Sequence, residues 1–247
     1  MINRYQIIIE YDGANLYGFQ IQKKGNTVQK LVQSTISKIL KEKIKIIGAG
    51  RTDKNVNSWG QSAHFDTKKK IINVKKFIQS LNFFLNQKLI SITEIKKRNL
   101  NFHARYSAKE RIYEYIILNR IAPPSLDKNK VWHIRKKLDL EIMKKGAKKL
   151  LGTHDFSTFR ASNCYSKSPI RTIKKINIKR INKKIVIQFK SKSFLRNQVR
   201  SMVGCLKYLG EKKWSLKKFT EVFKSKKRTL CAPPAPSHGL FLEKVIY

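Results

Sequence analysis

Apolar residues follow a helical spacing in some segments of this chain and a strand-like spacing in others. The order of these segments limits the folds that the chain can adopt. Apolar residues at helical spacing predict helices over residues 28–40, 74–85, 140–151, 195–209 and 216–223. Apolar runs or two-residue alternation predict strands over residues 4–11, 44–47, 62–66, 90–95, 111–118, 170–180, 184–190 and 240–247. Because several strands follow one another without a helix between them, we predict an α+β fold with a mixed sheet, not a doubly wound parallel sheet.

A polar stretch near the middle of the chain predicts a boundary between two domains. Residues 102–108 precede a new strand, so we place the halves at residues 1–108 and 109–247. The predicted strand at 111–117 resembles the one at 4–9 in sequence, which indicates two related α/β halves. Thr27 and Asp139 stand directly before predicted helices and are expected to cap them.

The charge balance favours a polyanionic partner. The chain has 55 Lys and Arg against 15 Asp and Glu, a formal net charge of +40. A basic surface attracts a phosphate backbone through counterion release. Lys, Ile and Asn are all abundant, however, as expected from a genome rich in A and T, and this second explanation of the excess Lys stays open.

Cysteine usage and hydropathy exclude other classes of protein. Cys164, Cys205 and Cys231 are widely spaced and form no C-x-x-C pair, which supports neither a disulfide framework nor a zinc site. The apolar runs are far shorter than a membrane span, and no signal peptide precedes Tyr5. We therefore expect a cytoplasmic protein without a membrane contact.

The scarcity of acids narrows the search for a catalytic carboxylate. Most of the fifteen have ordinary structural explanations, such as the turn at Asp12 and the helix cap at Asp139. Asp53, Asp66 and Asp155 remain. For Asp66 we expect a solvated turn before a run of lysines, and for Asp155 a hydrogen bond to loop backbone.

Asp53 lies in a loop of small residues, 48–53, between two predicted strands. Arg51, two residues earlier, is a cation that would keep the carboxylate ionised, as a nucleophile or base requires. An Asx-type turn is the structural alternative. A metal site is not expected, because no further acids cluster by spacing.

Several separated segments together resemble one family, the tRNA pseudouridine synthases of the TruA type. They include Gly-Arg-Thr-Asp at 50–53 and Phe-His-Ala-Arg-Tyr-Ser-Ala at 102–108. The other matching segments are residues 11–13, 17–20, 60–61, 111–115, 155–160, 194–200, 232–234 and 239–242. All occur in the family's order, so the resemblance covers essentially the whole chain.

The resemblance implies a fold and a reaction. The fold would be the pseudouridine synthase fold, two similar α/β halves with a mixed, mostly antiparallel sheet around a central basic cleft. The reaction would be isomerisation of uridine to pseudouridine at positions 38, 39 and 40 of the tRNA anticodon stem-loop, with no cofactor and no metal. Members of the family are homodimers, and tRNA would be the partner.

The resemblance also assigns roles to residues. The catalytic residues would be Asp53 as the nucleophile, Tyr113, which would stack on the target base and help to remove its proton, and Arg200, which would pair with Asp53. Substrate binding would further involve Arg51 at the backbone of the flipped nucleotide, the apolar side chain of Leu240, and Arg160 with the neighbouring 156–159 loop.

The chain departs from the family pattern in places. Asn57 replaces a histidine, Phe19 a tryptophan and Gln198 a methionine. Asn55 stands where left-handed backbone angles are expected, which asparagine tolerates well. Two other functions stay open at this point: a basic RNA-binding protein without catalytic activity, and a metal-dependent nuclease.

Overall fold

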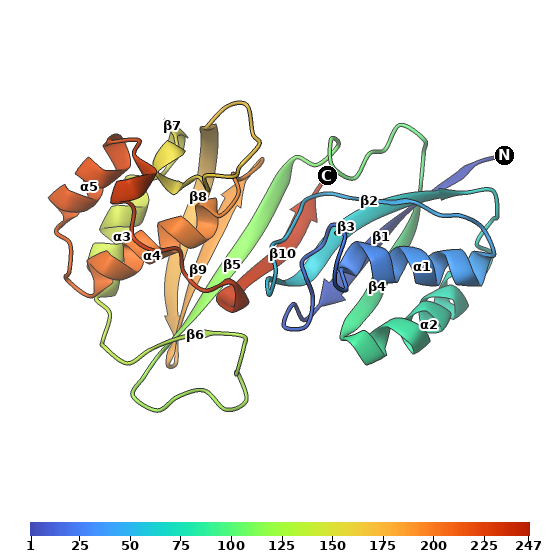
Figure 1. Ribbon diagram of the computed structural model, residues 1–247, viewed down its shortest axis with the longest axis horizontal. Helices are drawn as coiled ribbons and strands as arrows, with labels where there is room; N and C mark the ends of the chain where they lie inside the picture. The colour runs from blue at the N-terminus through green and yellow to red at the C-terminus, as the bar shows by residue number, and fades with distance from the viewer. The chain divides into compact units, whose positions relative to one another are not determined.

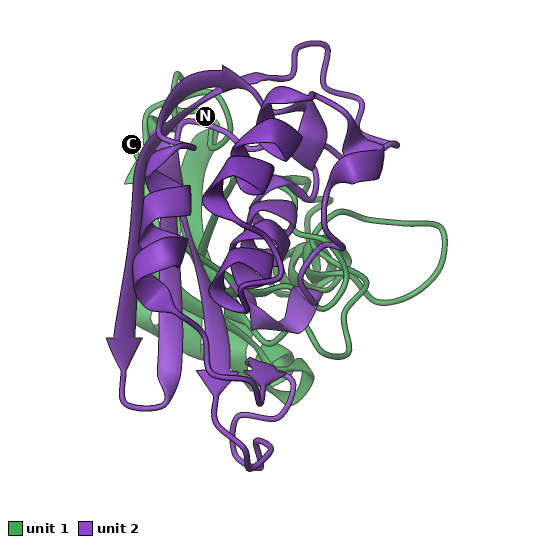
Figure 2. Cartoon of the chain, turned by 90° about the vertical axis from the view of Figure 1, so that its left-hand side faces the viewer, with its two compact units in different colours: residues 1–109, 241–247 green, residues 110–240 purple.

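The computed structural model describes residues 1–247 and divides them into two compact units (Figure 2). Unit 1 consists of residues 1–109 and 241–247, and unit 2 of residues 110–240. The division expected from the sequence, after residue 108, differs from this one at the C-terminus. The last strand belongs with unit 1 because it pairs there through Phe241 and Leu242.

Unit 1 is built on a sheet whose main strands follow the order β4-β1-β3-β10, with the short β2 paired to β3 (Figure 1). The strands are β1 (Asn3–Tyr11), β2 (Ile46–Gly48), β3 (Asn57–Thr67), β4 (Ile90–Arg98) and β10 (Leu240–Ile246). The β1–β3, β1–β4 and β2–β3 pairs are antiparallel, whereas β10 runs parallel to β3. The sheet is therefore mixed, as predicted.

Two helices, α1 (Val28–Leu40) and α2 (Val74–Leu85), lie side by side in unit 1 (Figure 1). A 3-10 turn, η1 (Asn86–Lys88), follows α2. The predicted cap is confirmed, since Thr27 Oγ1 accepts a hydrogen bond from the N–H of Lys30 at 3.3 Å. The apolar stripe of α1 is buried in the same core cluster as Ile7 and Ile9 of β1.

The strands of unit 2 follow the order β5-β9-β8-β7, with β6 paired to β5 (Figure 1). The strands are β5 (Glu110–Asn119), β6 (Trp132–Ile134), β7 (Gly152–Asp155), β8 (Ile170–Ile181) and β9 (Lys184–Ser191). All pairs are antiparallel except β5–β6. The sequence prediction found the long strands and missed β6 and β7, which are too short to show a periodic pattern.

Three helices, α3 (Leu140–Lys148), α4 (Gln198–Gly210) and α5 (Leu216–Lys224), pack against one another in unit 2. The 3-10 turns are η2 (Ser157–Phe159), η3 (Arg228–Leu230) and η4 (Ser237–Gly239). Asp139 caps α3 as predicted, accepting from the N–H groups of Glu141 and Ile142. The helix ends earlier than expected because tight three-residue hydrogen bonds replace α-helical ones at Leu150 and Leu151.

The observed fold is α+β with mostly antiparallel strand pairs, which confirms the fold class expected from the sequence. None of the helices combines the length and the apolar composition that crossing a lipid bilayer requires.

Candidate active site

Asp53 lies in the loop that joins the antiparallel strands β2 and β3. The side chain is half-buried and that of Arg51 is exposed. Two hydrogen bonds tie the start of the loop to β3: the N–H of Ala49 donates to Ser62 O at 2.7 Å, and Gln61 Nε2 donates to Gly50 O at 2.9 Å. The expected small-residue loop between strands is confirmed.

A second segment, residues 11–20, supports the loop next to Asp53. The N–H of Phe19 donates to Thr52 O at 3.1 Å, and the hydroxyls of Tyr11 and Thr52 are hydrogen-bonded at 2.8 Å. Gly18 has a φ of +85°, and a Cβ there would lie 2.5 Å from Thr52 O. Only glycine fits this position, because a side chain would be strained and would push the loop away.

The residues after Asp53, which depart from the family pattern, have structural roles. Asn55 has a φ of 64°, so the expected left-handed conformation is confirmed. Asn57 is buried, and its Oδ1 accepts a hydrogen bond from the N–H of Gly13 at 2.8 Å. Lys54 Nζ lies over the ring of Tyr17, 4.2 Å from its centroid. These contacts hold both halves of the loop against the 11–20 segment.

Other carboxylates have structural partners. Asp12 Oδ1 accepts from the N–H of Ala14 at 2.9 Å, and Asp155 Oδ1 from the N–H of Ser157 at 2.8 Å, both as expected. The interpretation of Asp66 as a solvated turn is wrong. Asp66 lies within β3 and accepts two hydrogen bonds of 2.7 Å from Arg4, whose guanidinium holds the pKa of this carboxyl below its ordinary value.

Tyr113 is a half-buried residue of β5, paired in register with Phe189 of β9. Its ring meets that of Phe194 edge to face, with centroids 5.3 Å apart. A tyrosine held in this way keeps a fixed ring orientation, which a residue that stacks on a base requires.

Arg200 is half-buried on α4, and unit 2 itself fixes the direction of its side chain. Its Nε donates to Ala235 O at 2.7 Å and its Nη1 to Asn197 Oδ1 at 3.2 Å. The backbone is tied as well, since the N–H of Ala235 donates to Arg200 O at 3.0 Å. The pairing of Arg200 with Asp53 stays a prediction.

The proline-rich segment 232–236, which accepts the hydrogen bond from Arg200, is followed closely in the chain by Leu240. Tyr115 donates from its hydroxyl to Pro236 O at 2.7 Å, and burial raises the pKa of this tyrosine. A Cβ at Gly239 would lie 2.9 Å from the Tyr115 ring, so the chain passes close to it. Leu240 follows and is 7% exposed. Sequence reasoning missed Tyr115, although it lies in a segment that matches the family.

Arg160 is half-buried, and its Nη2 donates to Cys164 O at 2.6 Å and to Ser166 O at 2.7 Å. These bonds shape the loop that follows η2. Phe156 and Phe159 are buried and their rings contact that of Phe223. The two rings therefore belong to the core of unit 2 and are not exposed for contact with RNA.

The candidate residues are divided between the units. Asp53 and Arg51 belong to unit 1, whereas Tyr113, Arg160, Arg200 and Leu240 belong to unit 2. No three His, Cys, Asp or Glu side chains gather so as to hold a metal ion.

Comparison with known proteins identifies the class. A family model described as tRNA pseudouridine synthase matches residues 7–107 and 147–247. The chain belongs to this family, whose members are isomerases that convert uridine to pseudouridine in tRNA.

Individual relatives cover nearly the full chain. A protein named tRNA pseudouridine synthase A from Pelagibacter ubique (strain HTCC1062) is 64% identical over 244 residues, which are 99% of each chain. Proteins of the same name are 39% identical in Caulobacter vibrioides (strain NA1000 / CB15N) and 40% identical in Paramagnetospirillum magneticum (strain ATCC 700264 / AMB-1). Both alignments cover 99% of this chain, and they cover 98% and 95% of the respective relatives.

Proposed function

We propose that this chain isomerises uridine to pseudouridine at positions 38, 39 and 40 of the tRNA anticodon stem-loop, with Asp53 as the nucleophile. The observation that supports this most is the fixed loop around Asp53. Thr52, the preceding residue, accepts a hydrogen bond from the N–H of Phe19 and shares one with the hydroxyl of Tyr11, and Gly18 packs closely against its carbonyl oxygen. A carboxylate that attacks one sugar carbon needs such a fixed position.

The chemistry requires few groups. The bond between the ribose and N1 of uracil breaks, the base rotates, and C5 of the base bonds to the ribose; N1 gains a proton and C5 loses one. A carboxylate next to the sugar stabilises the electron-poor ribose carbon by bonding to it or assists an elimination there. No redox step and no external group enters this balance, so we propose a reaction without cofactor or metal.

The other candidates have roles in holding the nucleotide. A uridine must leave the base stack to be attacked, at a cost of a few kcal/mol, and stacking on Tyr113 offsets part of this cost. We propose that Arg51 binds the phosphate backbone, that Leu240 contacts the base, and that Arg160 shapes a loop contacting the RNA. Arg200 would pair with Asp53 and keep it ionised.

A single assay separates this function from the two alternatives. Unmodified tRNA is incubated with the protein in EDTA, and pseudouridine is mapped with carbodiimide. We expect product at the three positions, and a rate lowered about 10⁴-fold or more in Asp53→Asn. Asp127→Asn is the matched control, because Asp127 is a half-buried carboxylate paired with Lys184 outside the candidate site.

The outcomes are distinct. Full product from Asp53→Asn would refute the role of Asp53. Tight tRNA binding without product would favour a non-catalytic RNA-binding protein. Cleavage in a parallel reaction with Mg²⁺, absent from the reaction in EDTA, would favour a nuclease. We further infer from the family a cytoplasmic homodimer, for which light scattering should give twice the 28.9 kDa mass of the chain.

A further inference from the structure

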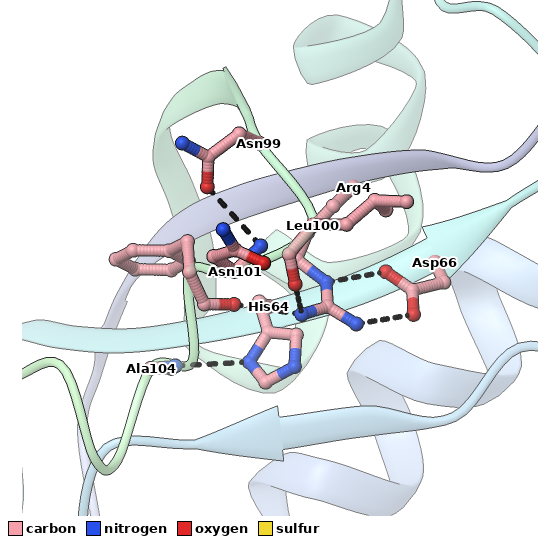
Figure 3. A network of polar contacts seen from close by, with 8 residues as sticks. Arg4, His64, Asp66, Asn99, Leu100, Asn101 and Ala104 are labelled. Atoms are coloured by element: carbon pink, nitrogen blue, oxygen red, sulfur yellow. Dashed lines mark hydrogen bonds and ion pairs between the residues drawn. The ribbon is translucent and has the colours of Figure 1, made fainter.

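The segment that follows β4, residues 99–108, is held to the rest of unit 1 by an ion-pair network (Figure 3). Arg4 of β1 binds Asp66 through two hydrogen bonds. The remaining nitrogen, Nη1, donates to Leu100 O at 2.5 Å and to Phe102 O at 2.8 Å. All three nitrogens of the guanidinium are thus engaged, and Nη1 fixes the backbone at the start of the segment.

Further contacts fix the centre of the same segment. The N–H of Ala104 donates to His64 Nδ1 at 3.1 Å (Figure 3), and Tyr247 donates from its hydroxyl to Ala104 O at 2.8 Å. The rings of Phe102 and Tyr247 lie 4.8 Å apart and are packed against Ala49 and Ala104. A surface loop with this many specific contacts is rigid before any ligand binds.

The outer side of the segment presents three side chains, His103, Arg105 and Tyr106, which we call the 103–106 platform. His103 Nδ1 accepts from the N–H groups of Arg105 and Tyr106. The rings of His103 and Tyr106 lie 4.3 Å apart at an angle of 31°, and the Arg105 guanidinium lies 5.6 Å from the Tyr106 centroid. Tyr106 is nonetheless 74% exposed. A tyrosine whose purpose was core packing would be buried, so this exposure needs another reason.

The surroundings of the platform are basic and rich in amides. A pocket of about 390 Å³ beside it is lined by Lys97, Arg98, Asn99, Asn101, Phe102 and Ser107, with no carboxylate among them. An exposed aromatic ring, bordered by cations and amide groups, is the combination by which proteins bind unpaired bases and their phosphates. A protein partner of opposite charge would need no exposed ring held in a fixed orientation.

We propose that the 103–106 platform binds tRNA outside the catalytic residues, with the Tyr106 ring stacked on one unpaired base and Arg105 and Lys97 on neighbouring phosphates. This proposal rests on the proposed function for the identity of the RNA. Stacking through a ring tolerates any base, so the platform would strengthen binding of many tRNAs and would not select among them.

The test compares Tyr106→Ala with Tyr106→Phe and Tyr106→Trp in filter binding of unmodified tRNA at fixed salt. We expect the Kd of Tyr106→Ala to rise roughly 5- to 150-fold, while the two aromatic variants bind as the wild type does. KM should rise with Kd, and kcat at saturating tRNA should stay unchanged. Phe83→Ala is the matched control, because Phe83 is a 70% exposed aromatic of unit 1 packed edge to face on Phe84.

An unchanged Kd and KM in Tyr106→Ala would overturn the proposal, as would an equal loss in Phe83→Ala. Filter binding does not require pseudouridine formation, so a negative result for the platform can be told apart from a negative result for the proposed reaction. A wild type that makes pseudouridine while Tyr106→Ala binds normally would refute the platform alone. A wild type without product leaves the binding comparison intact as a test of the platform.

Discussion

His64 makes the stability of unit 1 depend on pH between 6.5 and about 4. The side chain is 2% exposed, and its Nδ1 accepts a hydrogen bond from the N–H of Ala104, which requires an unprotonated Nδ1. Burial, together with the positive charges of Arg4 and the neighbouring His103 and against the opposing effect of Asp66, lowers the pKa of this histidine from 6.5 to about 4. The folded state therefore favours the neutral ring.

The direction and size of the effect follow from this pKa. A group whose pKa is lower in the folded protein binds fewer protons there, so its contribution to stability is complete above pH 6.5 and is lost as the pH falls toward 4. Between about pH 7.5 and about pH 5 the loss is about 2 kcal/mol, and it approaches about 3 kcal/mol at still lower pH.

The assay is urea unfolding followed by circular dichroism, with the wild type compared with His64→Asn at each pH. Asparagine Oδ1 can accept from the Ala104 N–H in place of Nδ1 and does not titrate, so the variant should lose about 2 kcal/mol less over this range. His238, whose pKa burial also lowers, is present in both proteins and cancels. Parallel stability curves for the two proteins would refute the reasoning.

Three further predictions concern the Asp53 loop and the charge of the chain. Tyr11→Phe removes the buried hydroxyl that is hydrogen-bonded to Thr52, and should lower the free energy of unfolding in urea by about 1–3 kcal/mol. Adding Thr52→Val should lower it no further. Gly18→Ala should lower pseudouridine formation far more than Gly50→Ala, because a Cβ at Gly50 meets no atom within 4 Å; equal rates would contradict this. The affinity for tRNA should fall about 10³-fold or more between about 50 and 200 mM salt, whereas a flat response in filter binding would assign the excess lysine to compositional drift.

The helices and long strands could be predicted because each has a local periodic signal. The apolar stripe of α1 and the caps Thr27 and Asp139 are readable from a few neighbouring residues. The partnership of β10 with β3 has no such signal, because it joins Phe241 to Asn57 across most of the chain. For the same reason a boundary read from local composition leaves the last strand in the second half.

In the candidate site, too, features that depend on neighbouring residues could be predicted, and contacts with distant residues could not. The Asp53 loop was predicted from its small residues and neighbouring strands, but the support from Tyr11 and Gly18 comes from about forty and thirty residues away. The error at Asp66 has this cause too. A carboxylate before a run of lysines indicates a solvated turn locally, whereas its actual partner, Arg4, precedes it by 62 residues and lies on the paired strand.

Residues 54–57, where the chain departs from its family, determine the backbone shape of the loop, whereas the proposed chemistry rests on the carboxylate of Asp53. Asn55 supplies a backbone angle and Asn57 accepts the Gly13 N–H, so both side chains act on the backbone. A Cβ at Gly13 would lie 2.4 Å from Val56 O, which means that the two segments touch along their backbones. Residues 54–57 can therefore depart from the family pattern and preserve the shape that presents Asp53, as long as Asn55 and Asn57 keep these roles and the 11–20 segment keeps its glycines.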